Sequence, residues 1–445
     1  MIDLAKSSPV SAARLAAFEI LLRVEEGAYA SILLASREQK LSPPDRSLCH
    51  ELVMGVLRRQ LWLDRVVEQF SGRKSEEIDV AVQIILRLGL YQLRFLSRIP
   101  ASAAVNEAVN LVGRARVTSA RPFVNAVLRR ATREPDYDPT SLLNDPIDRL
   151  AVATSHPRWL IQNWISSFGI EETQVFADAN NEPAPIAFRV APNNASIVEV
   201  IEELRGNGGT VTASEIAKDA WRISGATSLV GQLASQGKIY LQDEASQLVA
   251  EVLAAKGGQT VLDLCAAPGS KTTHIAARLE GSGSVIAGDI HEHRIKTAAT
   301  LARLQRLTNI AFVVLDASKA LPFDGVFDRV LVDAPCSGTG TLRRNPEIRW
   351  RISPTDITEL SERQLRLLLN AASAVKPGGR LVYSTCSVEI AENEDVRRQF
   401  LENRTDFEPV KLAIERSLIT GHGTARTWPH KHGTDGFFIS AFKRV

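Results

Sequence analysis

The sequence has few cysteines and no long apolar run, and these two absences exclude several classes of protein. Its 445 residues include four cysteines, and no two of them form a C-x-x-C pair. So few cysteines do not make a disulfide framework, and without paired cysteines we expect no structural zinc site. No apolar run approaches the ~18 residues of a membrane-spanning helix. The apolar stretch near the N-terminus contains Arg14 and Glu19, unlike a secretory signal. These features predict a cytoplasmic protein with no metal and no membrane partner.

Net charge is also low, but it is unevenly distributed. The chain has 53 basic and 51 acidic residues, a net charge of +2. Residues 87–133 contain nine arginines, no lysine, no aspartate and a single acid, Glu107. Because a guanidinium can bind phosphate through two parallel N–H groups, this surplus favours a polyanionic partner such as nucleic acid. A solvated helical surface explains the same charge equally well.

The spacing of apolar residues changes twice along the chain and predicts a multidomain protein with three domains. Residues 1–140 repeat apolar positions at three- and four-residue steps, which predicts an all-α bundle, with Asp45 as a helix N-cap. Residues 141–240 combine a linker helix with short apolar runs and one further helix, which predicts a small α/β domain. Residues 241–445 alternate short strands with helices, which predicts a Rossmann-like α/β domain with a parallel sheet. Its predicted strands are Thr260–Leu264, Ser284–Ala287, Ile310–Leu315, Arg329–Val332 and Arg380–Tyr383.

The segment Val261–Lys271 predicts a ligand-binding turn. A buried strand runs into a Pro-Gly turn and then a helix, which places backbone N–H groups where a ligand can approach. Only Gly269 is present, so the segment lacks the dinucleotide-binding glycine pattern and no pyrophosphate cradle is expected. Asp289 ends the next strand, where an acid commonly binds ribose hydroxyls. A nucleoside-bearing ligand without a pyrophosphate fits S-adenosylmethionine.

Other acids are predicted at the same edge of the sheet. Asp263, Asp316 and Asp333 lie in or directly after strands, and the carboxyl ends of parallel strands meet at one edge. Together with Asp289 they could line one crevice. We expect at least one of them to act only as a helix cap.

Two cysteines follow the fourth and fifth predicted strands. Cys336 lies in Asp333-Ala-Pro-Cys-Ser-Gly-Thr-Gly, and Cys386 in Ser384-Thr-Cys-Ser. An isolated cysteine is usually a small buried apolar residue. Two cysteines beside a methyl donor instead indicate that the thiols take part in the reaction. Methylation of cytosine at carbon 5 is such a reaction, because a thiolate that adds to carbon 6 makes carbon 5 nucleophilic. A base then removes the carbon-5 proton and the thiol leaves.

Together, these motifs resemble the RNA cytosine-5 methyltransferases of the Nol1/Nop2/Sun family. The resemblance implies that Cys386 is the nucleophile, that Cys336 assists product release and that Asp333 faces the cytosine edge. The family usually has a second glycine where this chain has Ser270. The resemblance also implies a set of S-adenosylmethionine-binding residues: Cys265, Ala266, Ala267, Pro268, Gly269, Ser270, Lys271, Asp289, Asp316 and Asp333.

The N-terminal part resembles the RNA-binding antitermination factor NusB, in Val105–Val109 and Phe123–Arg129. A NusB-like domain joined to this catalytic domain is the layout of a bacterial methyltransferase of small-subunit ribosomal RNA. The resemblance therefore implies small-subunit ribosomal RNA as the partner. The same chemistry on transfer RNA and a catalytically silent RNA-binding assembly factor are the alternatives. A basic segment, Arg343–Arg351, could hold the RNA strand or form a salt-bridged surface. The oligomeric state stays open.

Overall fold

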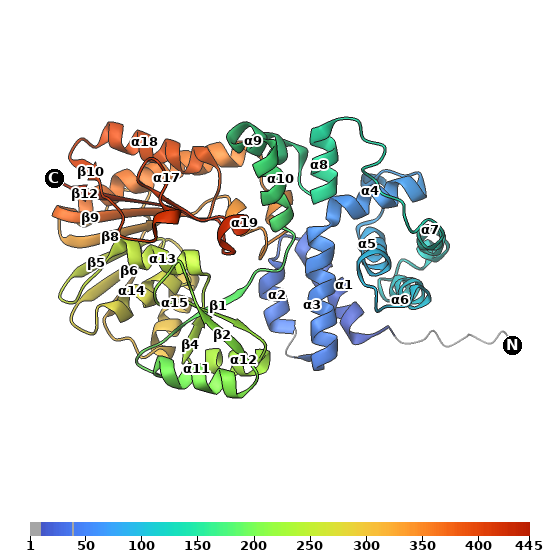
Figure 1. The fold of residues 1–445 in the computed structure, drawn as a ribbon, viewed down its shortest axis with the longest axis horizontal. Coiled ribbons are helices and arrows are strands. Elements are labelled where there is room, and N and C mark those ends of the chain that lie inside the picture. Colours follow the sequence, from blue (N-terminus) through green and yellow to red (C-terminus); the bar gives the residue numbers. More distant parts are fainter. Residues whose placement is uncertain (1–9, 38–39) are drawn as a thin grey trace. The chain divides into compact units, whose positions relative to one another are not determined.

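The computed structural model describes residues 10–37 and 40–445, which divide into two compact units. The first unit comprises Met1–Glu182 and a later segment, Leu342–Arg351. The second comprises Pro183–Thr341 and Ile352–Val445. Figure 1 shows the helices and strands of each unit. Across the described ranges, no helix is both long and apolar enough to cross a bilayer.

The first unit is built from α-helices, and its N-terminal helices share one apolar core. Its N-terminal helices are α1 (Ala12–Glu25), α2 (Ala30–Arg37), α3 (Pro43–Arg58), α4 (Gln60–Ser71), α5 (Val80–Phe95), α6 (Ala101–Arg114) and α7 (Arg121–Arg133). The later helices are α8 (Pro146–Thr154), α9 (Arg158–Phe168), α10 (Ile170–Ala179) and α16 (Ile348–Arg351). Helix α5 packs against α1, α3, α4, α6 and α7, because apolar residues cover most of its surface. The prediction of an all-α N-terminal bundle is confirmed.

The start of α3 corrects one detail of the sequence interpretation. Asp45 was predicted as the N-cap, but the structure assigns this role to Ser42, whose side chain accepts a hydrogen bond from the Asp45 backbone N–H. Pro43 and Pro44 then occupy the first helical positions. The N–H groups there have no intrahelical partner in any case, so proline costs nothing at these positions.

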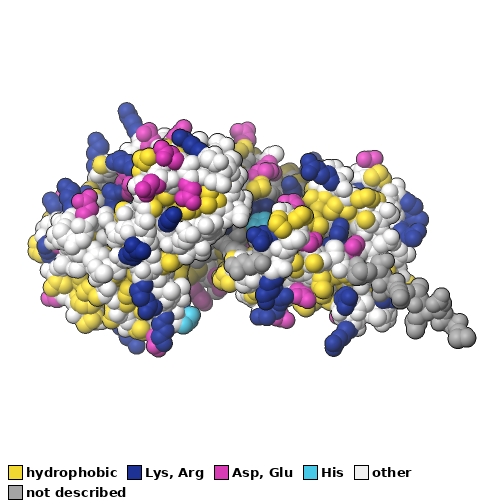
Figure 2. Space-filling model, turned by 90° about the horizontal axis from the view of Figure 1, so that it is seen from below, with side chains coloured by type: hydrophobic (Ala, Val, Ile, Leu, Met, Phe, Trp, Pro, Cys, Tyr) yellow, Lys and Arg dark blue, Asp and Glu magenta, His cyan; other side chains and the backbone are white. Residues whose placement is uncertain are grey.

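Most of the arginines in residues 87–133 lie on the surface. Arg87 is the exception: it is buried and forms two hydrogen bonds to the Asp64 carboxylate, at 2.7 and 2.9 Å. The exposed ones are Arg98, Arg114, Arg116, Arg121, Arg129 and Arg133. Figure 2 shows Lys and Arg side chains at several places on the visible face of this unit.

The second unit begins with a small antiparallel sheet. Its strands are β1 (Ile186–Val190), β2 (Thr210–Ala213), β3 (Trp221–Ser224) and β4 (Ile239–Leu241), in the order β2-β3-β1-β4. Helices α11 (Ile197–Gly206) and α12 (Thr227–Ser235) share its apolar core. The predicted small α/β domain is therefore present.

A larger, 8-stranded sheet carries the predicted sites. Its strands are β5 (Thr260–Leu264), β6 (Ser284–Asp289), β7 (Ile310–Val314), β8 (Phe327–Asp333), β9 (Val375–Thr385), β10 (Phe407–Pro409), β11 (Ala425–Arg426) and β12 (Phe438–Arg444). The helices around it are α13 (Glu244–Leu253), α14 (Ser270–Arg278), α15 (Glu292–Leu304), α17 (Pro354–Ala374), α18 (Glu394–Asn403) and α19 (Pro429–His432). Helices α13 and α14 cover one face and α17 and α18 the other (Figure 1). The Rossmann-like prediction is confirmed.

One edge of this sheet differs from the predicted parallel arrangement. Strands β9, β8, β5, β6 and β7 are parallel, as the alternation of strands and helices predicted. Strand β12 pairs antiparallel with β9, and β10 antiparallel with β12. The sheet is therefore mixed: β12 runs opposite to β9, whereas β10, which follows α18, runs in the same direction as β9.

A buried arginine of the small sheet holds the first turn of α14. Arg189, on β1, is 1% exposed. Its guanidinium donates to the Thr273 hydroxyl at 2.7 Å and to the Ser270 carbonyl at 3.3 Å. It also donates to the side chains of Gln242 and Gln305. These bonds connect the small sheet to the helix that follows the predicted ligand-binding turn.

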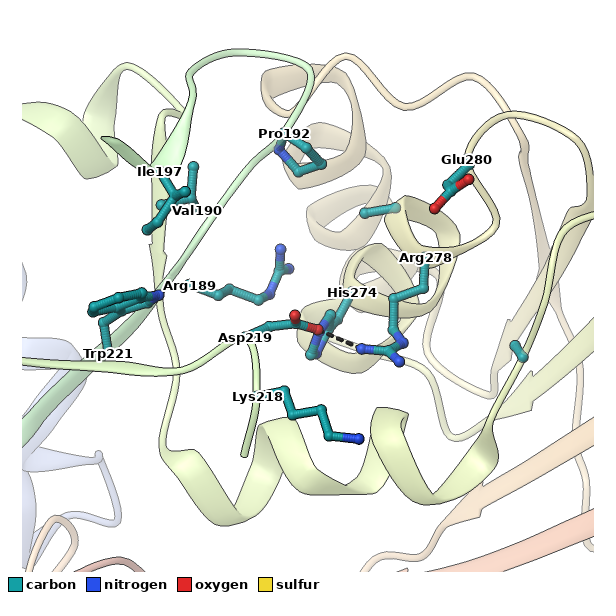
Figure 3. A pocket seen from close by; sticks show the side chains of 12 residues that line it. Arg189, Val190, Pro192, Ile197, Lys218, Asp219, Trp221, His274, Arg278 and Glu280 are labelled. Carbon is teal, nitrogen blue, oxygen red and sulfur yellow. Dashed lines mark hydrogen bonds and ion pairs between the residues drawn. The ribbon is translucent and has the colours of Figure 1, made fainter. Parts of the chain in front are cut away.

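A cavity of about 530 Å³ lies between the small sheet and α14 (Figure 3). Arg189 and Trp221 line it from the small sheet, and His274 and Arg278 from α14. His274 Nε2 lies 3.1 Å from an Asp219 carboxylate oxygen, which also pairs with Arg278. No residue predicted to bind S-adenosylmethionine lines this cavity.

Burial of His274 predicts a pH dependence of stability. Burial lowers the pKa of His274 from 6.5 to about 4. Between these values the unfolded chain takes up a proton that the folded chain does not, so the free energy of unfolding falls as pH falls. The variant His274→Gln does not titrate, so relative to it the wild type should lose about 2–3 kcal/mol between pH 7.5 and 4. Urea unfolding of both proteins across this range measures the difference. Parallel curves would contradict the prediction.

Candidate active site

The ends of two neighbouring strands bring the two predicted catalytic cysteines together. Strands β8 and β9 are paired in parallel, with Asp333 opposite Ser384. The loops that follow them carry Cys336 and Cys386, whose Sγ atoms lie 3.2 Å apart. Both residues are half-buried, and Cys386 packs against an apolar core of the sheet domain. One thiol can therefore donate a hydrogen bond to the other sulfur.

The surroundings of the pair keep a proton on Cys336. The hydrogen bond with Cys386 raises the pKa of Cys336 well above its ordinary value, and burial and the negative charge of Glu392 add to this effect. Cys336 therefore holds its proton more tightly than an isolated cysteine does. A protonated Cys336 beside Cys386 stabilises negative charge on the Cys386 sulfur, which is the form that attacks an electrophilic carbon.

An ion pair connects the predicted ligand-binding turn to the cysteines. Lys271 Nζ lies 2.7 Å from one Asp333 oxygen, and the Ser384 hydroxyl donates to the other at 2.8 Å. Burial by itself lowers the pKa of Lys271, but attraction to Asp333 and then to Cys386 raises it above its ordinary value. Lys271 thus stays charged.

The turn between β5 and α14 requires glycine at one position. Gly269 has φ of 102°, and a Cβ there would lie 3.0 Å from the Ala298 backbone on α15. The turn is also held by backbone bonds, since Ala266 N–H donates to the Gly288 carbonyl. Ser270 then begins α14. The single glycine thus allows both the left-handed turn and the close approach of α15.

Three of the four predicted carboxylates gather at this turn. Burial, followed by the charges of Asp333, Asp289 and Asp263, raises the pKa of the Cys265 thiol to about 12. Asp289 is buried and accepts a hydrogen bond from the His291 backbone N–H at 3.0 Å. Asp333 is paired with Lys271, and an Asp289 oxygen lies 3.7 Å from the Arg294 guanidinium, so cations partly balance these carboxylates.

Asp263 has an unused hydrogen-bonding atom inside this group. One carboxylate oxygen accepts from the Thr272 hydroxyl at 2.6 Å, while the other is buried and has no partner. Burial raises the pKa of Asp263 to about 7. A buried acceptor without a partner is costly, so this atom fits a site that a ligand amine completes.

Asp316 has a different environment from the other three acids. It follows β7, and its oxygen accepts hydrogen bonds from the backbone N–H and the hydroxyl of Ser318, at 3.0 and 2.6 Å. The hydrogen bonds from Ser318 lower the pKa of Asp316. These are the contacts of a local turn. Among the residues that the structure describes, no cluster of His, Cys, Asp and Glu is arranged to hold a metal ion.

Comparisons with known proteins match both units. Residues 250–443 match the family model of the 16S rRNA methyltransferase RsmB/F, residues 11–133 match the NusB family, and residues 156–229 match the ferredoxin-like domain of RsmF/B-like methyltransferases. The chain is 37% identical over 441 residues to the probable ribosomal RNA small subunit methyltransferase B of Bacillus subtilis (strain 168), covering 96% of this chain and 98% of the relative. It is 34% identical to the ribosomal RNA small subunit methyltransferase B of Pseudomonas putida (strain KT2440), covering 97% and 98%.

The chain belongs to the family of ribosomal RNA small subunit methyltransferase B. The resemblance drawn from the cysteine motifs and the NusB-like helices is thereby confirmed. The solved structure "Crystal Structure of PH0851" matches with a TM-score of 0.86 and 30% identity, covering 99% of this chain and 100% of that one. NSun6 from Pyrococcus horikoshii shares the fold over 65% of this chain and 98% of its own, with a TM-score of 0.59 and 22% identity.

In this RsmB-family chain, the segment after the Cys336 loop has a different role from the predicted one. Residues 343–351 were interpreted as a basic segment that could hold the RNA strand or form a salt-bridged surface. Instead, Arg343 and Arg349 are buried, and the Arg349 guanidinium donates to the Ser155 carbonyl and the Asn181 side chain within the helical unit. Glu347 accepts from the Ala30 backbone N–H at 2.9 Å. Buried guanidinium groups need such acceptors, and these contacts hold the segment within the helical unit.

One group at this RsmB-family site was not predicted from the sequence. Glu392 is fully buried behind the two cysteine loops, and Gln364 lies beside it on α17. The pattern Glu392-Asn393-Glu394 is polar and predicts an exposed turn. Its burial depends on which loops meet there, so no local sequence pattern identifies Glu392.

Proposed function

We propose that this protein transfers a methyl group from S-adenosylmethionine to carbon 5 of a cytidine in small-subunit ribosomal RNA. The reaction proceeds through a covalent bond between the Cys386 sulfur and carbon 6. The observation that carries this proposal is the pair of half-buried cysteines, with sulfurs 3.2 Å apart, next to the Lys271–Asp333 ion pair. A single thiol would serve nucleophilic attack, but only the pair explains both attack and release.

Each side chain of the pair and its neighbours has a role in this chemistry. Cys386 attacks carbon 6 as a thiolate, with the charged Lys271 ammonium nearby. The electrons pushed onto carbon 5 make that carbon the methyl acceptor. Asp333 faces the cytosine edge, where a carboxylate can bind the exocyclic amine. Cys336 assists the departure of Cys386 from the methylated base.

The turn from Cys265 to Lys271, with Asp289, Asp316 and Asp333, is the proposed S-adenosylmethionine site. The partnerless Asp263 oxygen and the gathered carboxylates fit a ligand that carries an amine and a sulfonium. Asp289 at the end of β6 is suited to ribose hydroxyls. Bound there, S-adenosylmethionine supplies the methyl group.

Ribosomal RNA is the proposed substrate because the Pseudomonas putida relative is named a ribosomal RNA small subunit methyltransferase and shares nearly the whole chain. The exposed arginines of the helical unit are suited to the phosphate backbone. A cytosine must leave its stack to reach a half-buried sulfur, so we expect the target in a loop or in an incompletely assembled particle.

Bisulfite sequencing of RNA from a deletion strain tests this proposal. We expect loss of one 5-methylcytidine from small-subunit ribosomal RNA and its return when the wild-type gene, but not the Cys386→Ala gene, is restored. Loss from transfer RNA instead would support the transfer RNA alternative. Unchanged methylation, together with no binding of S-adenosylmethionine by calorimetry, would support a catalytically silent assembly factor.

A further inference from the structure

The Glu392 carboxylate joins the two cysteine loops. It accepts hydrogen bonds from the backbone N–H and the hydroxyl of Ser337, the residue after Cys336. It also accepts from the hydroxyl of Ser387, the residue after Cys386, and from the Gln364 amide at 2.9 Å. One carboxylate thus holds the residues directly following both sulfurs.

Neighbouring bonds keep Glu392 in this position. The Tyr383 hydroxyl donates to the Glu392 carbonyl, and the Gln364 amide also donates to the Pro335 carbonyl at 3.0 Å. Asn393 donates to the Ser387 carbonyl at 2.9 Å. The carboxylate is therefore anchored from α17, from β9 and from the loop that carries it.

Glu392 is fully buried, and its hydrogen-bond donors are all neutral groups. In the described part of the chain, no Lys or Arg forms an ion pair with it. A buried charge is costly even when hydrogen-bonded, and a neutral glutamine would fill the same volume. We therefore expect the negative charge of Glu392 to have a function.

We propose that Glu392 is a positioning residue that holds the Cys336 thiol beside the Cys386 sulfur and so determines how fast the methylated product is released. This inference rests on the proposed function. In the release step, the carbon-5 proton passes to solvent and its electron pair forms the C5=C6 double bond. The C6–Sγ electron pair returns to Cys386, where the Cys336 S–H group stabilises it by a hydrogen bond. The negative charge of Glu392 supports this, since it disfavours loss of the Cys336 proton.

The variant Glu392→Gln separates charge from packing. Glutamine keeps the size and one acceptor oxygen but loses the charge. We expect the covalent adduct to form within about threefold of the wild-type rate, while its release slows at least tenfold. Labelled RNA on denaturing gels, sampled during a single turnover, measures both rates. Ser387→Ala, which removes one donor to Glu392, should slow release in the same direction by a smaller factor.

Glu394→Gln is the matched control. Glu394 lies two residues away, and its carboxylate binds Arg426 at 2.7 Å rather than either cysteine loop. We expect wild-type formation and release for this variant.

Three results would overturn the inference. The first is a wild-type rate of product release in Glu392→Gln. The second is an equal loss of adduct formation and product release in that variant. The third applies if Glu392→Gln does not fold, and is a wild-type rate of product release in Ser387→Ala. Failure of the proposed function looks different, because the wild type itself would then form no adduct.

Discussion

Replacing Cys386 by alanine is expected to abolish methyl transfer and to leave no covalent complex with RNA. The structure places this sulfur in a half-buried position, 3.2 Å from the Cys336 sulfur, and the proposed mechanism assigns the attack to Cys386 alone. Without the nucleophile, carbon 5 stays unreactive, and we expect turnover to fall by roughly 10³-fold or more. Transfer of labelled methyl groups to small-subunit RNA measures this loss.

A cysteine outside the site provides the control for this experiment. Cys49 is fully buried in the helical core and belongs to the other unit. The variant Cys49→Ala should keep near-normal turnover, although burial of a smaller side chain lowers stability modestly. Near-normal turnover in Cys386→Ala would refute the assigned mechanism.

Replacing Cys336 by alanine is expected to trap the enzyme on its RNA. Attack by Cys386 does not need the Cys336 side chain to bond with the base, so the adduct still forms. Its release loses the thiol that stabilises the departing sulfur, so the protein should stop after about one turnover. A slowly migrating protein–RNA band that survives denaturation measures this outcome.

The double variant Cys336→Ala/Cys386→Ala tests the origin of that band. Because the trapped bond involves the Cys386 sulfur, the band should disappear in the double variant. A band that persists would assign the bond to another nucleophile. Absence of the band in Cys336→Ala itself would show that Cys336 has no part in release.

Much of the fold was predictable because its determinants are local. The strand Thr260–Leu264 is a short apolar run between turn residues, and the structure reproduces its predicted bounds. The antiparallel edge at Phe438–Arg444 was not predicted from its pattern. A short apolar run indicates a strand but not its direction, which depends on the partner it pairs with.

The burial of individual arginines was likewise not predictable from local sequence. Arg114 and Arg349 are both in polar stretches of sequence, yet Arg114 is exposed and Arg349 is fully buried. Charge composition reports how many arginines a segment has. Burial depends on acceptors such as the Ser155 carbonyl, which lies 194 residues away in the chain.

By itself, the sequence determined the order of the domains, the turn at Gly269 and the presence of two cysteines after strands, since each of these depends on adjacent residues. Only the tertiary structure decided that sulfurs 50 residues apart lie 3.2 Å from one another, that Lys271 reaches Asp333, and that Glu392 joins both loops. The physical reason is the parallel pairing of β8 with β9. It brings their carboxyl ends together and so creates contacts that no local pattern encodes.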